Sequence, residues 1–376
     1  LFISLTALLS GLLNAGGRFM AAAAAPVLMN FILIVAMLMA DRFGWDMGLA
    51  MAWSTPVSGI AQLFCVWWAA KRMGFALRIR RPRLSPDMRR LLAIAAPAVL
   101  AGGVVQVNLL VGRQVGSFFD GAIAWLTNAD RLYQLPLGVV GIAIGIVLLP
   151  DIARRLKAGD TDGGRHAYNR ATEFALFLTV PAGVALMVAA YPLISVLFKR
   201  GAFMQADVGP TALALAIYGA GLPAFVLQKV LQPLYFARED TRTPFRFALW
   251  SMVVNAVMAL GLAPFIGFSA AALGTTIAGW TMAAQLWLGT RAFGEAAALD
   301  ARLRHRLPRI VAASVVMGVA IWAMRLVLDP ALETPSLRYL ALTALVLGGI
   351  GAYGVAAVLL GAIRPSDLRA GLRRQR

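Results

Sequence analysis

The chain has 376 residues, of which 60% are hydrophobic and 14% are charged, and its formal net charge is +18. A soluble domain carries about 25% charged residues, so this composition excludes an ordinary soluble protein. The positive charges lie in short segments between apolar stretches, without interleaved aromatic residues or a basic domain around them. This pattern argues against nucleic-acid binding.

Apolar stretches of membrane-spanning length recur along the whole chain. A helix needs about 20 residues to cross the hydrocarbon core of a bilayer, and about eleven stretches approach that length. They cover residues 1–15, 21–40, 48–70, 91–116, 122–149, 172–197, 208–236, 244–264, 268–290, 308–328 and 339–363. Each stretch is apolar on all sides, as a helix in lipid must be. The sequence therefore predicts an all-α integral membrane protein, a polytopic bundle of about eleven transmembrane helices.

The loops between these stretches alternate in charge. One set is rich in arginine and comprises Arg18, the segments 71–90, 154–170, 238–246 and 291–309, and the tail from Arg364. The opposite set holds only Arg42, Lys199, Arg200 and Arg338. By the positive-inside rule we expect the arginine-rich set in the cytoplasm, which makes the C-terminus cytoplasmic. Because Leu1 already lies in an apolar stretch, we also expect upstream spans to be missing.

The segment 71–90 is the longest charged break in the first half of the chain. It fits a cytoplasmic linker between two helical lobes, and it equally fits a basic loop drawn to anionic lipid headgroups. Inside the spans, prolines such as Pro181 and Pro192 predict kinks. Gly141 and Gly145 are expected to allow close contact between helices.

Basic residues also lie inside the predicted spans, at Arg113, Arg131, Lys229 and Arg325. An ionisable side chain there costs ~2.5–3.5 kcal/mol on insertion scales, so it implies a partner or a cavity. Arg113 and Arg325 are near external ends, where a long side chain reaches the interface. Lys229 allows either a structural pairing or a role in a cavity.

Arg131 lies well inside its span, next to Asp130 and one helical turn from Gln134. Adjacent residues point about 100° apart on a helix, so Asp130 and Arg131 need not pair. Arg131 therefore either pairs with another helix or serves as a cavity cation for an anionic substrate. Arginine binds phosphate oxygens through a planar fork and stays charged in a dry cavity. A cationic cavity thus favours a phosphate-bearing substrate over a cationic drug.

Sequence signatures of membrane-bound enzymes are absent. The chain contains no Walker A, GxSxG or HExxH sequence. Asp151, Asp160 and Asp162 fall in a segment that we expect to be a loop, with only His166 near them, and this arrangement offers no paired acid and base. We therefore predict a transporter rather than an enzyme, without a cofactor or a metal.

A series of short runs covers essentially the whole chain. They are Leu12-Leu13-Asn14 with Gly17-Arg18-Phe19, Ala25-Pro26 to Asn30, Ala129-Asp130-Arg131-Leu132 with Pro136-Leu137-Gly138, Leu148-Leu149-Pro150, and Arg200-Gly201-Ala202-Phe203. The most specific run extends from Lys229-Val230-Leu231 through Tyr235 to Pro244. In this order and spacing the chain resembles the MurJ (MviN) lipid II flippase family of the multidrug/oligosaccharidyl-lipid/polysaccharide exporter superfamily.

The resemblance implies two six-helix lobes followed by two terminal helices, with this chain beginning at about the fourth helix, so that the first lobe is incomplete. It divides the chain into the remaining helices of the N-terminal lobe (1–70), a basic cytoplasmic linker (71–90), the C-terminal six-helix lobe (91–292), and two terminal helices with a basic tail (293–376).

The resemblance also implies a substrate-binding site, in which Arg131 is the cavity arginine of the second lobe. The expected substrate-binding residues are Arg131, Asp130, Gln134, Arg18, Asn14, Asn30 and Lys229. Gln134 stands where some members have Glu. Gly112 occupies the place of a carboxylate that helps bind sodium in some relatives, and Asn255 is the only polar partner left there, so no metal site is expected.

The function implied is that of a lipid II flippase in the bacterial inner membrane. It would move undecaprenyl-pyrophosphate-linked muropeptide from the cytoplasmic to the periplasmic leaflet, with membrane lipids and the cell-wall synthesis machinery as further partners. The alternatives are an exporter of another polyprenyl-linked polysaccharide or of drugs, and a non-transporting membrane scaffold, for which Arg131 would have no use.

Overall fold

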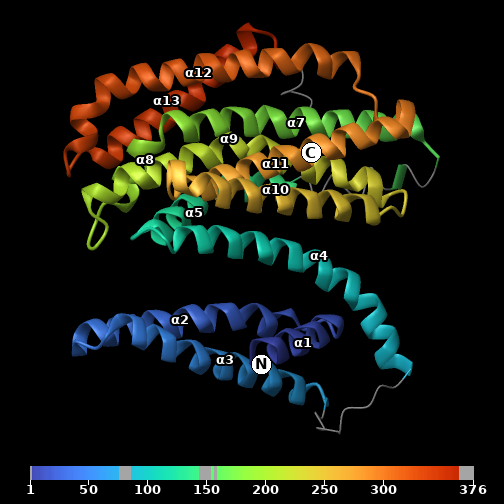
Figure 1. The fold of residues 1–376 in the computed structure, drawn as a ribbon, viewed down its shortest axis with the longest axis vertical. Coiled ribbons are helices and arrows are strands. Elements are labelled where there is room, and N and C mark those ends of the chain that lie inside the picture. Colours follow the sequence, from blue (N-terminus) through green and yellow to red (C-terminus); the bar gives the residue numbers. More distant parts are fainter. Residues whose placement is uncertain (1, 76–85, 144–153, 156–158, 364–376) are drawn as a thin grey trace. The chain divides into compact units, whose positions relative to one another are not determined.

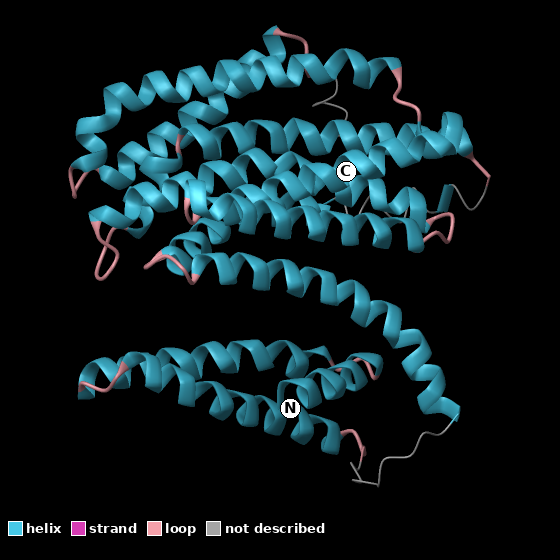
Figure 2. Ribbon diagram, in the orientation of Figure 1, coloured by secondary structure: helices cyan, strands magenta, loops and turns pink. Residues whose placement is uncertain are grey.

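The computed structural model describes residues 2–75, 86–143, 154–155 and 159–363. Every regular element within these ranges is helical (Figure 2). In chain order the helices are α1 (Phe2–Ala15), α2 (Phe19–Phe43), α3 (Met47–Arg72), α4 (Pro86–Gly116), α5 (Ala122–Ala143), α7 (Thr161–Val188), α8 (Ala190–Phe198), α9 (Gln205–Phe236), α10 (Arg242–Ile266), α11 (Ser269–Gly289), the 3-10 helix η2 (Thr290–Ala297), α12 (Ala301–Glu333) and α13 (Arg338–Leu359). The chain divides into two compact units, Leu1–Leu91 and Leu92–Arg376.

Each predicted apolar stretch overlaps at least one described helix. Among the described helices, α2, α3, α7, α9, α10, α12 and α13 are long and apolar enough to cross a membrane. The chain is therefore an all-helical, multi-pass membrane protein, while the total of about eleven spans stays a prediction. Most of the linker segment, the end of the predicted span 122–149 and the C-terminal tail lie outside the described residues.

The predicted span 172–197 forms two helices, which corrects the expectation of one. α7 begins before this span, where the Asp160 carboxylate accepts a hydrogen bond of 2.8 Å from the Gly163 backbone. The break between α7 and α8 follows from Pro192, which lacks the N–H that would bond to the Val188 carbonyl and whose ring crowds that carbonyl. Asp160 and Asp162 therefore start a helix, although a loop was expected there.

The arginine-rich segment 291–309 is largely helical, which corrects a second expected loop. The Asp300 carboxylate caps α12 by accepting a hydrogen bond of 2.7 Å from the Leu303 backbone. Arg302 and Arg306 thus lie in the first two turns of α12, where both pair with Glu173 of α7. These residues, with Arg170 and Asp300, form what we call the Glu173 cluster.

The first unit contains α1, α2 and α3, which pack around Leu9, Leu13 and Val66. α1 and α2 are joined by a tight turn that requires the left-handed backbone of Gly17, at φ 72°. α2 ends at Gly44, which is also left-handed, and the Asp46 carboxylate then caps α3.

The second unit is built around α9, which contacts α5, α7, α8 and α11 (Figure 1). Its middle carries no charge from Pro210 to Gln228, so that it can be buried on several sides. α12 packs on α7 and α13. Met317 and Ile321 of α12 belong to one core cluster with Leu345 of α13.

Candidate substrate-binding site

α5 carries Arg131 on a face that is open within the second unit. Ala129 and Tyr133 are buried in a core cluster that includes Leu222 of α9. Arg131, between them in sequence, is exposed. Helical geometry therefore anchors α5 through Ala129 and Tyr133 and turns Arg131 away from that core.

The polar neighbours of Arg131 pair with each other. Gln134 donates a hydrogen bond from Nε2 to Oδ2 of Asp130, one helical turn away. Asp130 and Arg131 do not form an ion pair, as their angular separation on the helix predicts. In the described part of the second unit, Arg131 has no hydrogen-bond or ion-pair partner. The alternative in which Arg131 pairs structurally with another helix finds no support within that unit.

Lys229 is the exposed residue between the partly buried Gln228 and the buried Val230 on α9. Its side chain lies against Gly141 of α5, because a Cβ added to Gly141 would stand 3.1 Å from Lys229 Cδ and 3.3 Å from Cε. Gln228 instead donates a hydrogen bond of 2.8 Å to the Gly279 carbonyl of α11. The structure thus places Lys229 beside the helix that carries Arg131.

The first unit carries the other three predicted site residues, all of them exposed. Asn14 and Arg18 share the turn between α1 and α2, where the Asn14 carbonyl accepts a hydrogen bond of 3.0 Å from the Gly17 backbone. Asn30 lies about 18 Å from Arg18 along α2 at the helical rise per residue. Arg18 and Asn14 therefore form one local group, and Asn30 is separate from it.

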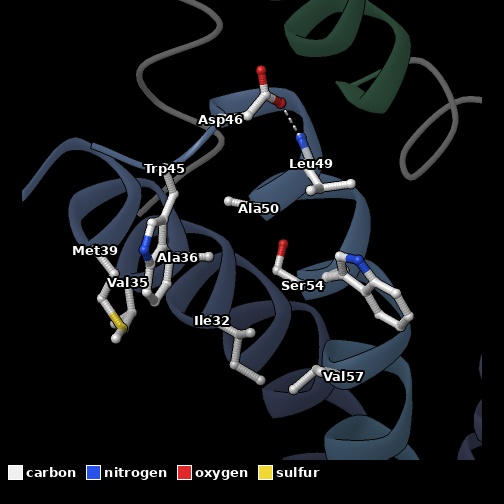
Figure 3. Close-up of a pocket in the computed structure, with 11 residues that line it drawn as sticks. Ile32, Val35, Ala36, Met39, Trp45, Asp46, Leu49, Ala50, Ser54 and Val57 are labelled. Atoms are coloured by element: carbon white, nitrogen blue, oxygen red, sulfur yellow. Dashed lines mark hydrogen bonds between the residues drawn. The ribbon is translucent and has the colours of Figure 1, made fainter. Parts of the chain in front are cut away.

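An apolar groove of about 410 Å³ lies between α2 and α3 (Figure 3). Ile32, Met39, Trp45 and Val57 are among its lining residues. Asp46 lies at its edge, with its carboxylate engaged by the Leu49 backbone N–H at 2.6 Å. None of the predicted substrate-binding residues lines this groove. Its lining suits hydrocarbon rather than a charged headgroup.

Asn255 of α10, which the sequence singled out beside Gly112, is buried. Its Nδ2 donates a hydrogen bond of 2.9 Å to Asn108 Oδ1 of α4. A Cβ added to Gly112 would meet no atom within 4 Å. The amide pair therefore joins α4 to α10, and Gly112 contributes no side-chain ligand.

The Glu173 cluster was missed by reasoning from the sequence. Its arginines were assigned to solvated loops, and Glu173 was not recognised as an acid inside a predicted span. The available signal was the single carboxylate at the start of a long apolar stretch, because such a charge needs partners.

Comparison with known proteins agrees with this architecture. The family model described as "Lipid II flippase MurJ" matches residues 1–340. A protein of Rhizobium meliloti named "Probable lipid II flippase MurJ" is 41% identical over 378 residues, covering 99% of this chain and 70% of its own. The "Lipid II flippase MurJ" of Burkholderia cenocepacia is 31% identical over 330 residues, covering 85% of this chain and 63% of its own.

A solved structure shares the fold. "Lipid II flippase MurJ, inward closed conformation" superposes with a TM-score of 0.76 at 23% identity, covering 95% of this chain and 71% of the other. At that identity the likeness concerns the fold alone. Together with the family model and the relatives, it identifies the chain as a member of the MurJ family.

Proposed function

We propose that this chain is a lipid II flippase, a transporter rather than an enzyme. It moves undecaprenyl-pyrophosphate-linked muropeptide from the cytoplasmic to the periplasmic leaflet by alternating access. The observation that carries the proposal is Arg131, an exposed arginine without a partner in the described part of its unit, on a helix that the sequence predicts to span the membrane in a MurJ-family chain. A cation in that position is costly unless it meets an anion, and the pyrophosphate supplies one.

In this proposal Arg131 of the second unit lies on the transport path. Arg131 binds the pyrophosphate, and the hydrogen bond between Gln134 and Asp130 holds the acid apart from the arginine fork. Within the first unit, Asn14, Arg18 and Asn30 are further substrate-binding residues of the proposal. Residues 1–70 and 91–292 then act as lobes, 71–90 as their linker, and 293–376 as the terminal helices and tail.

The proposed orientation places the C-terminus in the cytoplasm. It is supported by the alternation of arginine-rich and arginine-poor loops along the chain. At the arginine-rich ends, cations also stack on aromatic rings, as they do at either membrane interface. The Arg72 guanidinium carbon lies 3.7 Å from the Trp68 ring centroid, and that of Arg238 lies 4.1 Å from the Phe293 ring centroid. The exported precursor must be consumed by polymerising enzymes outside the membrane, and we include that machinery among the partners.

Complementation tests the function. The complete gene, including any reading frame upstream of Leu1, is expressed in a bacterium whose own lipid II flippase is depleted, and lipid II exposed on the outer leaflet is measured. We expect exposure and growth to return. Failure at normal membrane levels, or restored export of another polyprenyl-linked glycan without lipid II, would reject the proposal in favour of a related exporter.

A further inference from the structure

The position of Lys229 depends on a single glycine of a neighbouring helix. α9 is the central helix of its unit, and the residues that follow Lys229, Val230 and Leu231, are almost fully buried. Lys229 alone among them reaches the surface, and its stem lies along α5 at Gly141. A Cβ at Gly141 would stand 2.9 Å from Lys229 Nζ, closer than such contacts occur. A residue larger than glycine would therefore displace the lysine side chain.

The charge of Lys229 has no partner in the described part of the chain. No hydrogen bond or ion pair involves its amine. The neighbouring Gln228 is used differently, since its amide ties α9 to the Gly279 carbonyl of α11. An ammonium group inside a membrane bundle is costly to leave without an anion. Among the described residues, the Lys229 ammonium is therefore left without an anion.

Gly141 and Arg131 belong to the same face of α5. At 100° per residue, Arg131, Gln134, Gly138 and Gly141 fall within a sector of about 80°, and about 15 Å separates Arg131 from Gly141 along the axis. Gly138 and Gly141 have no side chain, so they expose backbone on that face of α5. At Gly138 the surrounding space is open, since an added Cβ would meet no atom within 4 Å. Arg131 therefore lies toward one end of this face of α5, and Lys229 of α9 lies against its other end at Gly141.

We propose that Lys229, positioned by Gly141, is a second contact for the anionic headgroup, used before or after Arg131 rather than with it. This inference rests on the proposed function. In the proposed orientation α5 and α9 both run from the external to the cytoplasmic side of the membrane, so that Gly141 and Lys229 lie nearer the cytoplasmic end than Arg131. The spacing of about 15 Å favours successive contacts with one pyrophosphate. Lys229 then receives the headgroup from the cytoplasmic leaflet and passes it to Arg131.

Binding of undecaprenyl pyrophosphate to the purified full chain in nanodiscs tests the role of the lysine. We expect Lys229→Met to weaken binding about tenfold, as the loss of one charge-assisted contact does, and Lys229→Arg to retain most of the affinity. The wild-type affinity should fall with added salt more steeply than that of Lys229→Met. Equal affinity and equal salt dependence in wild type and Lys229→Met would overturn the inference.

Gly141→Ala tests the positioning, with Gly138→Ala as a control on the same face. We expect Gly141→Ala to weaken binding as Lys229→Met does, to add no further loss in the Lys229→Met background, and to change the rate at which Lys229 reacts with an amine reagent. Gly138→Ala should leave both measurements unchanged. Equal behaviour of the two alanine variants, or an additive loss with Lys229→Met, would contradict the role of Gly141.

Comparing the wild type, Arg131→Ala and Lys229→Met separates failure of this inference from failure of the proposed function. If Arg131→Ala weakens binding and Lys229→Met does not, this inference fails and the proposed function stands. If the wild type does not bind the probe, both fail. Thermal unfolding of each variant shows whether it is folded. If Gly141→Ala does not fold, the binding affinities of Lys229→Met and Lys229→Arg test the inference.

Discussion

Glu173 of α7 and Arg302 of α12 form a two-point ion pair, in which Nε and Nη2 of the arginine lie 3.2 Å from Oε2 and Oε1 of the carboxylate. Arg306 and Arg170 approach the same carboxylate, and Arg170 also contacts Asp300. The Glu173 side chain is 11% exposed and that of Arg306 is 7% exposed. The cluster therefore fastens the start of α12 to α7, through the largely buried charges of Glu173 and Arg306 and the more exposed charge of Arg302.

Replacing Glu173 by Gln should destabilise the protein strongly. The change leaves Arg306 buried without its carboxylate, and breaking a buried ion pair from one side costs about 3 kcal/mol. We expect a clear fall in the unfolding temperature in detergent and faster proteolysis of α12. Arg304→Gln is the control, since Arg304 is exposed in the first turn of α12. Similar unfolding temperatures for the two variants would show that the cluster does not hold the helices.

The Asp300 carboxylate should make stability depend on pH at the acid end. Burial alone raises the pKa of Asp300, but the Leu303 backbone N–H and the Arg170 guanidinium outweigh burial and hold the pKa below its ordinary value. The contribution of Asp300 is therefore full above the unfolded pKa of about 3.9 and is lost as the pH falls through the lower folded pKa. The unfolding temperatures of wild type and Asp300→Asn should differ at pH 7 and converge at the lowest pH. A difference that persists there would contradict this assignment.

A close approach of α7 and α9 should make Gly183 intolerant of alanine. A Cβ at Gly183 would lie 2.6 Å from the Gly219 carbonyl oxygen, so the two helices would have to separate. We expect a destabilisation of about 1–3 kcal/mol, as overpacking produces. Gly209→Ala on α9 is the control, because a Cβ there meets no atom within 4 Å. Equal unfolding temperatures for the two alanine variants would rule out a close contact.

Topology can be tested with single cysteines in a Cys65→Ser background. Asp162 in the first turn of α7 and Ala202 in the turn before α9 are both exposed. The proposed orientation predicts that a membrane-impermeant thiol reagent labels Ala202→Cys in intact cells and labels Asp162→Cys only after permeabilisation. The reverse pattern would invert the assigned orientation.

The sequence predicted the positions of the helices because each stretch of about 20 apolar residues is a strong local signal. It did not predict where α7 and α12 begin, because the capping residues Asp160 and Asp300 extend both helices into polar sequence. The close contact between Gly183 of α7 and Gly219 of α9 could not be predicted either. Each helix contributes a single glycine to it, so neither sequence shows a repeated small-residue pattern that marks the contact.

The part of the candidate site that gives a local signal in the sequence was predictable. Arg131 was evident as an isolated charge in an apolar stretch, and its hydrogen-bonded neighbours lie within one turn of it. The apposition of Lys229 and Gly141 joins residues far apart in the chain. Gly141 was expected to serve helix contact alone, and only the packing of α5 on α9 indicates what it adjoins.

Substitutions at Arg131 show whether this arginine binds the pyrophosphate during transport. In a bacterium depleted of its own flippase, lipid II exposure on the outer leaflet is measured for the wild-type gene, Arg131→Ala and Arg131→Lys at equal membrane levels. We expect no lipid II exposure with alanine, and partial exposure with lysine, which keeps the charge but loses the fork that binds two phosphate oxygens. Wild-type exposure and growth with Arg131→Ala would contradict the account.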